Sequence, residues 1–361
     1  MAHLRTARQR ALAAGGCLFA LALVNLSRAQ TLPAQSAETQ PVTSTDVRRA
    51  IEEIRVTPHG IAKYDYIMTA RVRLLLFWAG QDDVGGGYIR RGLFADKPSA
   101  EFFQIVMGSD PAKAPRAINR WGAAVELLRQ GGAGATPESS TFFGFMKVYK
   151  GNSVSEMQKE LEGEKGGHRF LFSAILNRAD RSESIAKSVP FATDTDFNIH
   201  QLDQAELVVF DRLENTEGRV RSLAPGQFRS CGRPEGFLSS VEELVDDALA
   251  GHKTPESLCY VYNGQLFRLT LNRVTPVERE TVKFSLHGTS RPYVHEYHNL
   301  VLARIENFNE TMHQGSSFEL LLGTAGALRG VPVKIDYQPN WWFQVELNLK
   351  TSEESNIAGL H

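Results

Sequence analysis

Residues 259–286 read CYVYNGQLFRLTLNRVTPVERETVKFSL and contain the clearest hairpin signal in the chain. Asn263-Gly264 lies between two runs rich in β-branched and aromatic residues. A type I′ turn needs positive φ at both central positions, which asparagine and glycine tolerate. A two-residue loop also fixes the register, so we expect Tyr260 to pair with Phe267. The stretch therefore predicts an antiparallel hairpin with both rings on one apolar face.

The pattern of alternating apolar and polar residues continues to the C-terminal region. The further predicted strands are 282–287, 300–305, 318–322, 331–335 and 341–350. Pro332 cannot donate to a strand ladder and should stand at a strand start or edge. A sheet with one apolar face must curl on itself or pack on another layer. We therefore expect a curved antiparallel meander, either barrel-like or a sandwich.

The first half of the chain gives a mixed pattern. Strands are expected at 64–78, 101–107, 142–149 and 170–176, and helices at 45–54, at 115–130 and from Ser153. The predicted fold class is thus α+β and β-rich, with an N-terminal α+β layer domain before the meander. The expected organisation is a signal peptide (1–29), a flexible leader (30–43), an α+β domain (44–180), a linker (181–205), an antiparallel β domain with one helix (206–350) and a flexible tail (351–361).

The N-terminal residues have the pattern of an export signal. Arg5, Arg8 and Arg10 precede an apolar stretch over 11–26, and Ser27-Arg28-Ala29 resembles a cleavage site. We expect cleavage between Ala29 and Gln30 and a secreted or periplasmic mature protein. No later stretch is long and apolar enough for a membrane span, so none is expected in the mature chain.

Charge narrows the range of partners. Removing residues 1–29 takes away four arginines and no acidic residue, which leaves 36 basic against 41 acidic residues and a formal charge of −5. The basic residues are scattered, whereas nucleic-acid binding needs concentrated positive charge. We expect no nucleic-acid partner. The expected partner is an apolar small molecule or lipid, or else an envelope protein.

The mature chain keeps two cysteines, Cys231 and Cys259. In an exported protein such a pair favours a disulfide, which contributes about 3–4 kcal/mol in the chain-entropy model. Two reduced, buried cysteines are the alternative.

A glycine-rich segment follows the first long predicted strand. Asp83, Gly85, Gly86 and Gly87 precede Arg90 and Arg91, so backbone amides and two cations are available to an anion. The segment lacks the ending of a phosphate-binding loop and opens no evident helix. It is a candidate binding loop, and a hairpin or β-bulge is the alternative.

His287, His295 and His298 form the densest group of candidate metal ligands. The pair at 295 and 298 is one residue short of a zinc-protease spacing, and residues three apart on a strand point to opposite faces. A zinc site needs His287 to converge with one of them across neighbouring strands. No cofactor is expected otherwise, and zinc is the alternative.

These observations support three hypotheses. The first is an exported, non-catalytic envelope protein that binds an apolar or amphipathic ligand or a protein partner, because no catalytic constellation is recognisable. The second is a metal-dependent hydrolase that uses the three histidines. The third is a purely structural envelope protein.

Overall fold

The computed structural model describes residues 44–54, 59–74, 77–94, 97–130, 137–147, 169–180, 184–223, 236–251, 257–310, 312–340 and 343–351. The predicted signal peptide with its cleavage site at Ala29 and Gln30, the leader 30–43 and residues 352–361 of the tail lie outside the described residues. The helix expected from Ser153 lies outside them as well.

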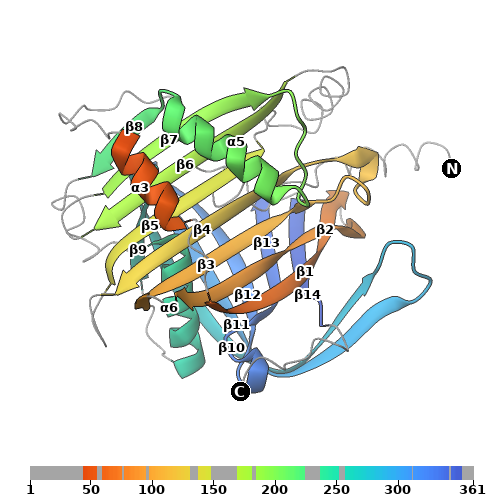
Figure 1. Ribbon diagram of the computed structural model, residues 1–361. Helices are drawn as coiled ribbons and strands as arrows, with labels where there is room; N and C mark the ends of the chain where they lie inside the picture. The colour runs from red at the N-terminus through yellow and green to blue at the C-terminus, as the bar shows by residue number, and fades with distance from the viewer. Residues whose placement is uncertain are drawn as a thin grey trace.

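The described chain is mostly β-strand (Figure 1). Its elements in chain order are α3 (Ser44–Ile54), β1 (His59–Leu74), β2 (Phe77–Phe94), β3 (Lys97–Ser109), the 3₁₀ helix η3 (Pro115–Ala117), β4 (Trp121–Gln130), β5 (Pro137–Lys147), β6 (Phe170–Asp180), β7 (Ser184–Thr193), α5 (Leu202–Asn215), β8 (Arg219–Leu223), α6 (Phe237–Ala250), β9 (Ser257–Tyr262), β10 (Gln265–Ser285), β11 (Pro292–Asn309), β12 (Gln314–Gly323), the 3₁₀ helix η5 (Gly326–Leu328), β13 (Pro332–Asn340) and β14 (Phe343–Leu349).

All fourteen strands belong to one antiparallel sheet. Its order is β8-β7-β6-β5-β4-β3-β2-β1-β14-β13-β12-β11-β10-β9, so each strand pairs with its neighbours in the chain. The exception is the seam between β1 and β14, where Tyr66 lies opposite Leu349. The first and last strands of the chain therefore pair in the middle of the sheet. The edge strands β8 and β9 are consecutive in sequence, with α6 between them.

The hairpin that opens the second half forms as predicted. Asn263 and Gly264 have φ of 52° and 64°, as a type I′ turn requires. Tyr260 pairs with Phe267, and their stacked rings lie with centroids 5.0 Å apart. Pro332 is the first residue of β13, as expected for a residue that cannot donate to the ladder.

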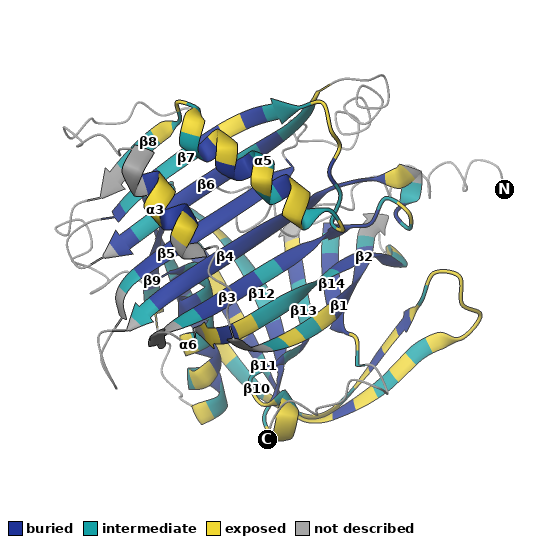
Figure 2. Ribbon diagram, viewed as in Figure 1, coloured by how far each residue is buried: buried dark blue, intermediate teal, exposed yellow. Residues whose placement is uncertain are grey.

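The sheet folds over so that β4–β6 face β9–β12, and α6 packs in the space between them (Figures 1 and 2). Phe142 of β5 contacts Tyr262 of β9 edge to face, with ring centroids 5.4 Å apart. Asn177 Nδ2 of β6 donates to Val261 O of β9 at 2.9 Å. These contacts join strands from the two halves of the chain without a ladder between them, and α6 buries one of its faces against both.

The opposite face of the first half is covered by two helices. In Figure 1, α3 and α5 lie across β4–β7, and their buried side chains join Phe143, Phe145 and Phe172 in one cluster. Val47, Ala50 and Ile51 give α3 its buried stripe, and the helix lies where the sequence predicts one. Strands β4–β6 are thus buried on both faces, as their dark colour in Figure 2 shows.

The prediction of a helix over 115–130 is wrong. The segment forms η3 and then β4, which lies between β3 and β5. Val125 faces the α3–α5 layer, whereas Ala124 faces α6. A strand that is buried on both faces does not alternate apolar and polar residues. Its apolar residues therefore also occur at the three- and four-residue spacing of a helix face. The N-terminal α+β layer is therefore replaced by a strand meander covered by α3 and α5.

The expected linker over 181–205 also differs from the structure. It contains β7, which pairs with both β6 and β8, and the beginning of α5. The sheet therefore runs continuously through the predicted boundary between 44–180 and 206–350. Helix α6 begins at Phe237, and it ends at Gly251 with φ of 73°, as expected for a C-terminal glycine. No helix among the described residues has the length and apolar character needed to cross a membrane.

Candidate functional site

Helix α6 begins against a buried carboxylate. Glu126 of β4 is fully buried, and its Oε2 accepts a hydrogen bond from Leu238 N at 2.7 Å. Its Oε1 accepts bonds from Ser239 Oγ at 2.8 Å and Ser140 Oγ at 3.1 Å. Burial raises the pKa of Glu126, and these hydrogen bonds oppose that shift. A helix N-terminus carries unpaired N–H groups and partial positive charge. The Glu126 carboxylate therefore binds the first turn of α6 and holds it against β4.

The middle of α6 carries an ion pair with β2. Arg91 Nη2 lies 2.5 Å from Glu242 Oε1, and the Glu242 side chain is only 19% exposed. Burial raises the pKa of Glu242 to about 7; Glu101 and Asp246 add to the rise, whereas Arg91 opposes it. Glu242 therefore changes charge near neutral pH, on the helix that packs between the two halves of the sheet.

Replacing Glu242 with glutamine is expected to remove part of the pH dependence of stability. The folded pKa of about 7 lies above the ordinary 4.5, so the folded state binds this proton more tightly than the unfolded chain. The stabilisation is complete below the unfolded pKa and is lost as pH rises through the folded one, a change of about 3 kcal/mol. Denaturant unfolding between about pH 4 and pH 8 should show a flatter profile for Glu242→Gln.

The matched control for this experiment is Glu243→Gln, an exposed neighbour on the same helix. It should leave the slope of stability against pH unchanged. Parallel profiles for wild type and Glu242→Gln would show that Glu242 has the same proton affinity in the folded and unfolded chain.

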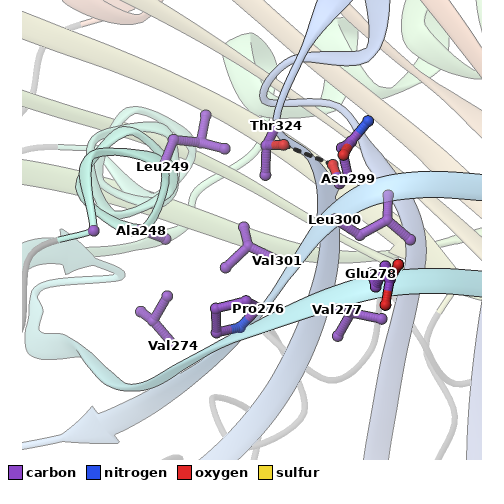
Figure 3. Close-up of a pocket in the computed structure, with 11 residues that line it drawn as sticks. Ala248, Leu249, Val274, Pro276, Val277, Glu278, Asn299, Leu300, Val301 and Thr324 are labelled. Carbon is purple, nitrogen blue, oxygen red and sulfur yellow. Dashed lines mark hydrogen bonds between the residues drawn. The ribbon is translucent and has the colours of Figure 1, made fainter.

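A groove of about 500 Å³ lies at the C-terminal end of α6 (Figure 3). Apolar residues from three elements line it: Leu249 of α6, Val274, Pro276 and Val277 of β10, and Leu300 and Val301 of β11. Leu300 and Val301 are buried, while Pro276 is exposed at the rim. Apolar walls with an open rim are typical of small-molecule sites of this size.

Three polar residues also line the groove. In Figure 3 Glu278 and Asn299 lie away from Ala248 and Leu249, and Thr324 lies between Leu249 and Asn299. Thr324 N and Oγ1 both donate to Asn299 O, at 2.9 and 2.7 Å. Asn299 has φ of 53°, a conformation that asparagine tolerates well. The groove therefore has an apolar end beside α6 and a polar end beside the strands.

None of these groove residues belongs to a site that the sequence predicts. Leu249, Val274 and Leu300 come from a helix and two strands that approach one another only after the sheet has folded over. No fixed spacing relates them. The signal that the sequence does contain is indirect: a strongly apolar helix end followed by an apolar meander.

The candidate binding loop lies inside strand β2, at a bulge opposite β1 between Met68 and Ala70. A β-bulge was the alternative that the sequence left open. Asp83 has φ of 50° and is buried, and its Oδ1 lies 2.9 Å from Lys113 Nζ. Its Oδ2 accepts a hydrogen bond from His287 N at 2.8 Å. Asp83 thus binds the end of the β10–β11 hairpin.

The three glycines of the candidate loop let neighbouring strands approach closely. A Cβ added at Gly85, Gly86 or Gly87 would lie 2.1 Å from Gly108 O, 2.2 Å from Tyr66 O or 1.8 Å from Val106 O, respectively. Each distance is far below a normal contact. The backbone approach that the glycines permit is therefore to β1 and β3 of the same sheet.

The two arginines after the glycines contact different partners. Arg90 lies over the Tyr88 ring at 4.5 Å and donates to Gln104 Oε1 at 3.4 Å. Arg91 pairs with Glu242 of α6. Because Arg90 and Arg91 are adjacent in a strand, they point to opposite faces of the sheet. The structure does not bring Asp83, Arg90 and Arg91 together around one space.

The histidines do not converge either. His295 lies between Tyr293 and Tyr297, with ring centroids 6.2 and 4.4 Å away. His298 Nε2 lies 3.0 Å from Glu296 Oε1 on the other face of β11. His287 is in the turn after β10. Within the described ranges, no three His, Cys, Asp or Glu side chains are placed to hold a metal ion. The zinc alternative gains no support from this geometry.

The predicted disulfide remains a prediction. Cys259 is buried in β9. Cys231 lies outside the described residues.

Comparisons with known proteins add little to this geometry. No family model matches the chain, and no curated protein matches it. One solved structure is similar, the crystal structure of a beta-barrel-like protein of a domain of unknown function, DUF1849, from Brucella abortus. It shares 10% sequence identity over 80% of this chain and 96% of that chain, with a TM-score of 0.30. A likeness at this level carries no argument about function.

Proposed function

We propose that the protein is an exported, non-catalytic binder of an apolar or amphipathic small molecule, which it holds in the groove at the C-terminal end of α6. The observation that carries this proposal is the groove itself. Its volume of about 500 Å³ lies in the range of small-molecule sites, and its walls are mainly apolar with a few polar groups. Export is supported by the N-terminal arginines, the apolar stretch and the Ser27-Arg28-Ala29 pattern.

The expected affinity follows from the apolar walls. Each methylene group that leaves water contributes about 0.8 kcal/mol. A chain of about eight carbons thus gives about 6 kcal/mol, part of which offsets the entropy lost on association. We therefore expect single-chain ligands of this length to bind with dissociation constants of about 0.1 to 1 mM.

Mass spectrometry on protein exported with its own signal tests the proposal. Under denaturing conditions we expect the mass of a chain that begins at Gln30, lowered by two hydrogens for a Cys231–Cys259 disulfide. Under native conditions we expect an adduct of lipid size. Retention of residues 1–29 would contradict export.

Two tryptophan variants locate the adduct. Leu249→Trp places a large ring in the groove and should abolish the adduct. Leu207→Trp, at a position 64% exposed on α5, should retain it. An adduct that persists in Leu249→Trp would place the ligand elsewhere. A stoichiometric metal adduct that is lost in His295→Ala would instead support the hydrolase hypothesis, and a bare chain would support a structural role.

A further inference from the structure

The charge on the described residues that line the groove is negative only. Of the described residues that line it, Glu278 is the charged one, and no lysine, arginine or histidine is among them. Glu278 is exposed and has no ion-pair partner among the described residues. An exposed carboxylate at the polar end of an apolar groove is available to a ligand.

Two described cations that are close in sequence to groove residues already have partners. Arg279, the next residue along β10, lies 3.7 Å from Glu296. Arg329 Nη1 donates to Thr324 O at 3.0 Å. Helix α6, which is described over its whole length, has no basic residue in its last turn. Its C-terminal end, beside the groove, carries partial negative charge.

We infer that the groove selects a cationic amphiphile, a molecule with one apolar chain and one ammonium group. This inference rests on the proposed function and specifies its ligand class. The apolar chain lies against Leu249, Val274 and Val301, and the ammonium group lies beside Glu278. The Asn299 side chain supplies a neutral acceptor at the same end of the groove.

The alternative head groups fit less well. A carboxylate would stand beside Glu278, where like charges repel and neither gains a cation to offset its loss of water. A hydroxyl gains a neutral hydrogen bond, which is weaker than a charge-assisted one. Because Glu278 is exposed, the preference should be moderate and should weaken as salt screens it.

Titration calorimetry with three ligands of equal chain length tests the inference. The probes are octylammonium, 1-octanol and octanoate, each kept below its aggregation concentration at low ionic strength. We expect octylammonium to bind about fivefold more tightly than 1-octanol and at least about tenfold more tightly than octanoate. In Glu278→Gln the preference for octylammonium over 1-octanol should fall to about twofold or less, while the affinity for 1-octanol stays unchanged.

The control variant Glu306→Gln removes the same charge from an exposed position on β11 outside the groove, and it should keep the full preference. Equal affinities for the three probes, or tighter binding of octanoate, would overturn the cationic preference and leave the groove as an apolar site. Failure of all three probes to bind would overturn the proposed function itself. A preference that survives in Glu278→Gln would assign the selectivity to another group and so also overturn the inference.

Discussion

Replacing Gly236 with alanine is expected to lower the free energy of unfolding by about 3–5 kcal/mol, because the added methyl group displaces a buried carboxylate. Gly236 is the residue before α6, with an ordinary φ of −80°, so the cost is steric rather than conformational. A Cβ at this position would lie 1.5 Å from Glu126 Oε1. The carboxylate must then move away from Leu238 N and Ser239 Oγ, which leaves a buried charge without its donors. Denaturant unfolding followed by tryptophan fluorescence measures the loss.

A double-mutant cycle separates this mechanism from a general intolerance of alanine. Glu126→Ala should itself cost about 3 kcal/mol, because it removes the acceptor of Leu238 N and Ser140 Oγ and leaves Ser239 Oγ with only its 3.3 Å bond to Gly236 O. It also removes the atom that the new methyl group meets, so Gly236→Ala should cost far less in that background, with a coupling energy above about 2 kcal/mol. Gly315→Ala, where the nearest atom would be 3.4 Å away on a side chain, should cost about 1 kcal/mol or less. Additive costs for Gly236→Ala and Glu126→Ala would contradict the contact.

The same carboxylate shows where sequence reasoning failed. Glu126 stands in the segment expected to be a helix, where a single acid between apolar residues has the pattern of an ordinary surface position. In the structure it is a strand residue whose function depends on α6, more than a hundred positions later. By contrast, the Asn263-Gly264 turn was predictable in detail, because its geometry depends on two adjacent residues and sets the pairing on both sides.

The candidate site, too, was predictable from the sequence only in part. The β10 and β11 residues that form the groove belong to the predicted meander, but the groove exists because α6 ends against them. The glycines after Asp83 indicated that another group approaches the backbone closely at this point. In the structure that group is the backbone of the neighbouring strands β1 and β3. Local signals thus identify which backbone is unusual. Which other segment that backbone contacts depends on how the sheet folds over, and no local sequence pattern predicts that fold.

Asp83 gives the second large effect, because it joins the β10–β11 hairpin to β2. Asp83→Ala is expected to lower the free energy of unfolding by about 3 kcal/mol and to accelerate hydrogen exchange in the hairpin. The variant loses the acceptor for His287 N and the partner of Lys113 Nζ. Alanine is also strained at φ of 50°, at a cost of about 1 kcal/mol. Asp82 Oδ2 still accepts from Ser285 N, so the hairpin should loosen at its end rather than detach.

Asp83→Asn is the matched control, because asparagine tolerates positive φ and its amide oxygen can still accept from His287 N. It loses only the charge that faces Lys113, whose side chain is 34% exposed and can turn to water. We therefore expect Asp83→Asn to lose about 1 kcal/mol and to keep the amide of His287 protected from exchange. If exchange at His287 is equally fast in both variants, the charge of Asp83 holds the hairpin. If it is slow in both, the hairpin is held by the burial of Val282, Phe284 and Tyr297 in the core, and the carboxylate contributes nothing to its attachment.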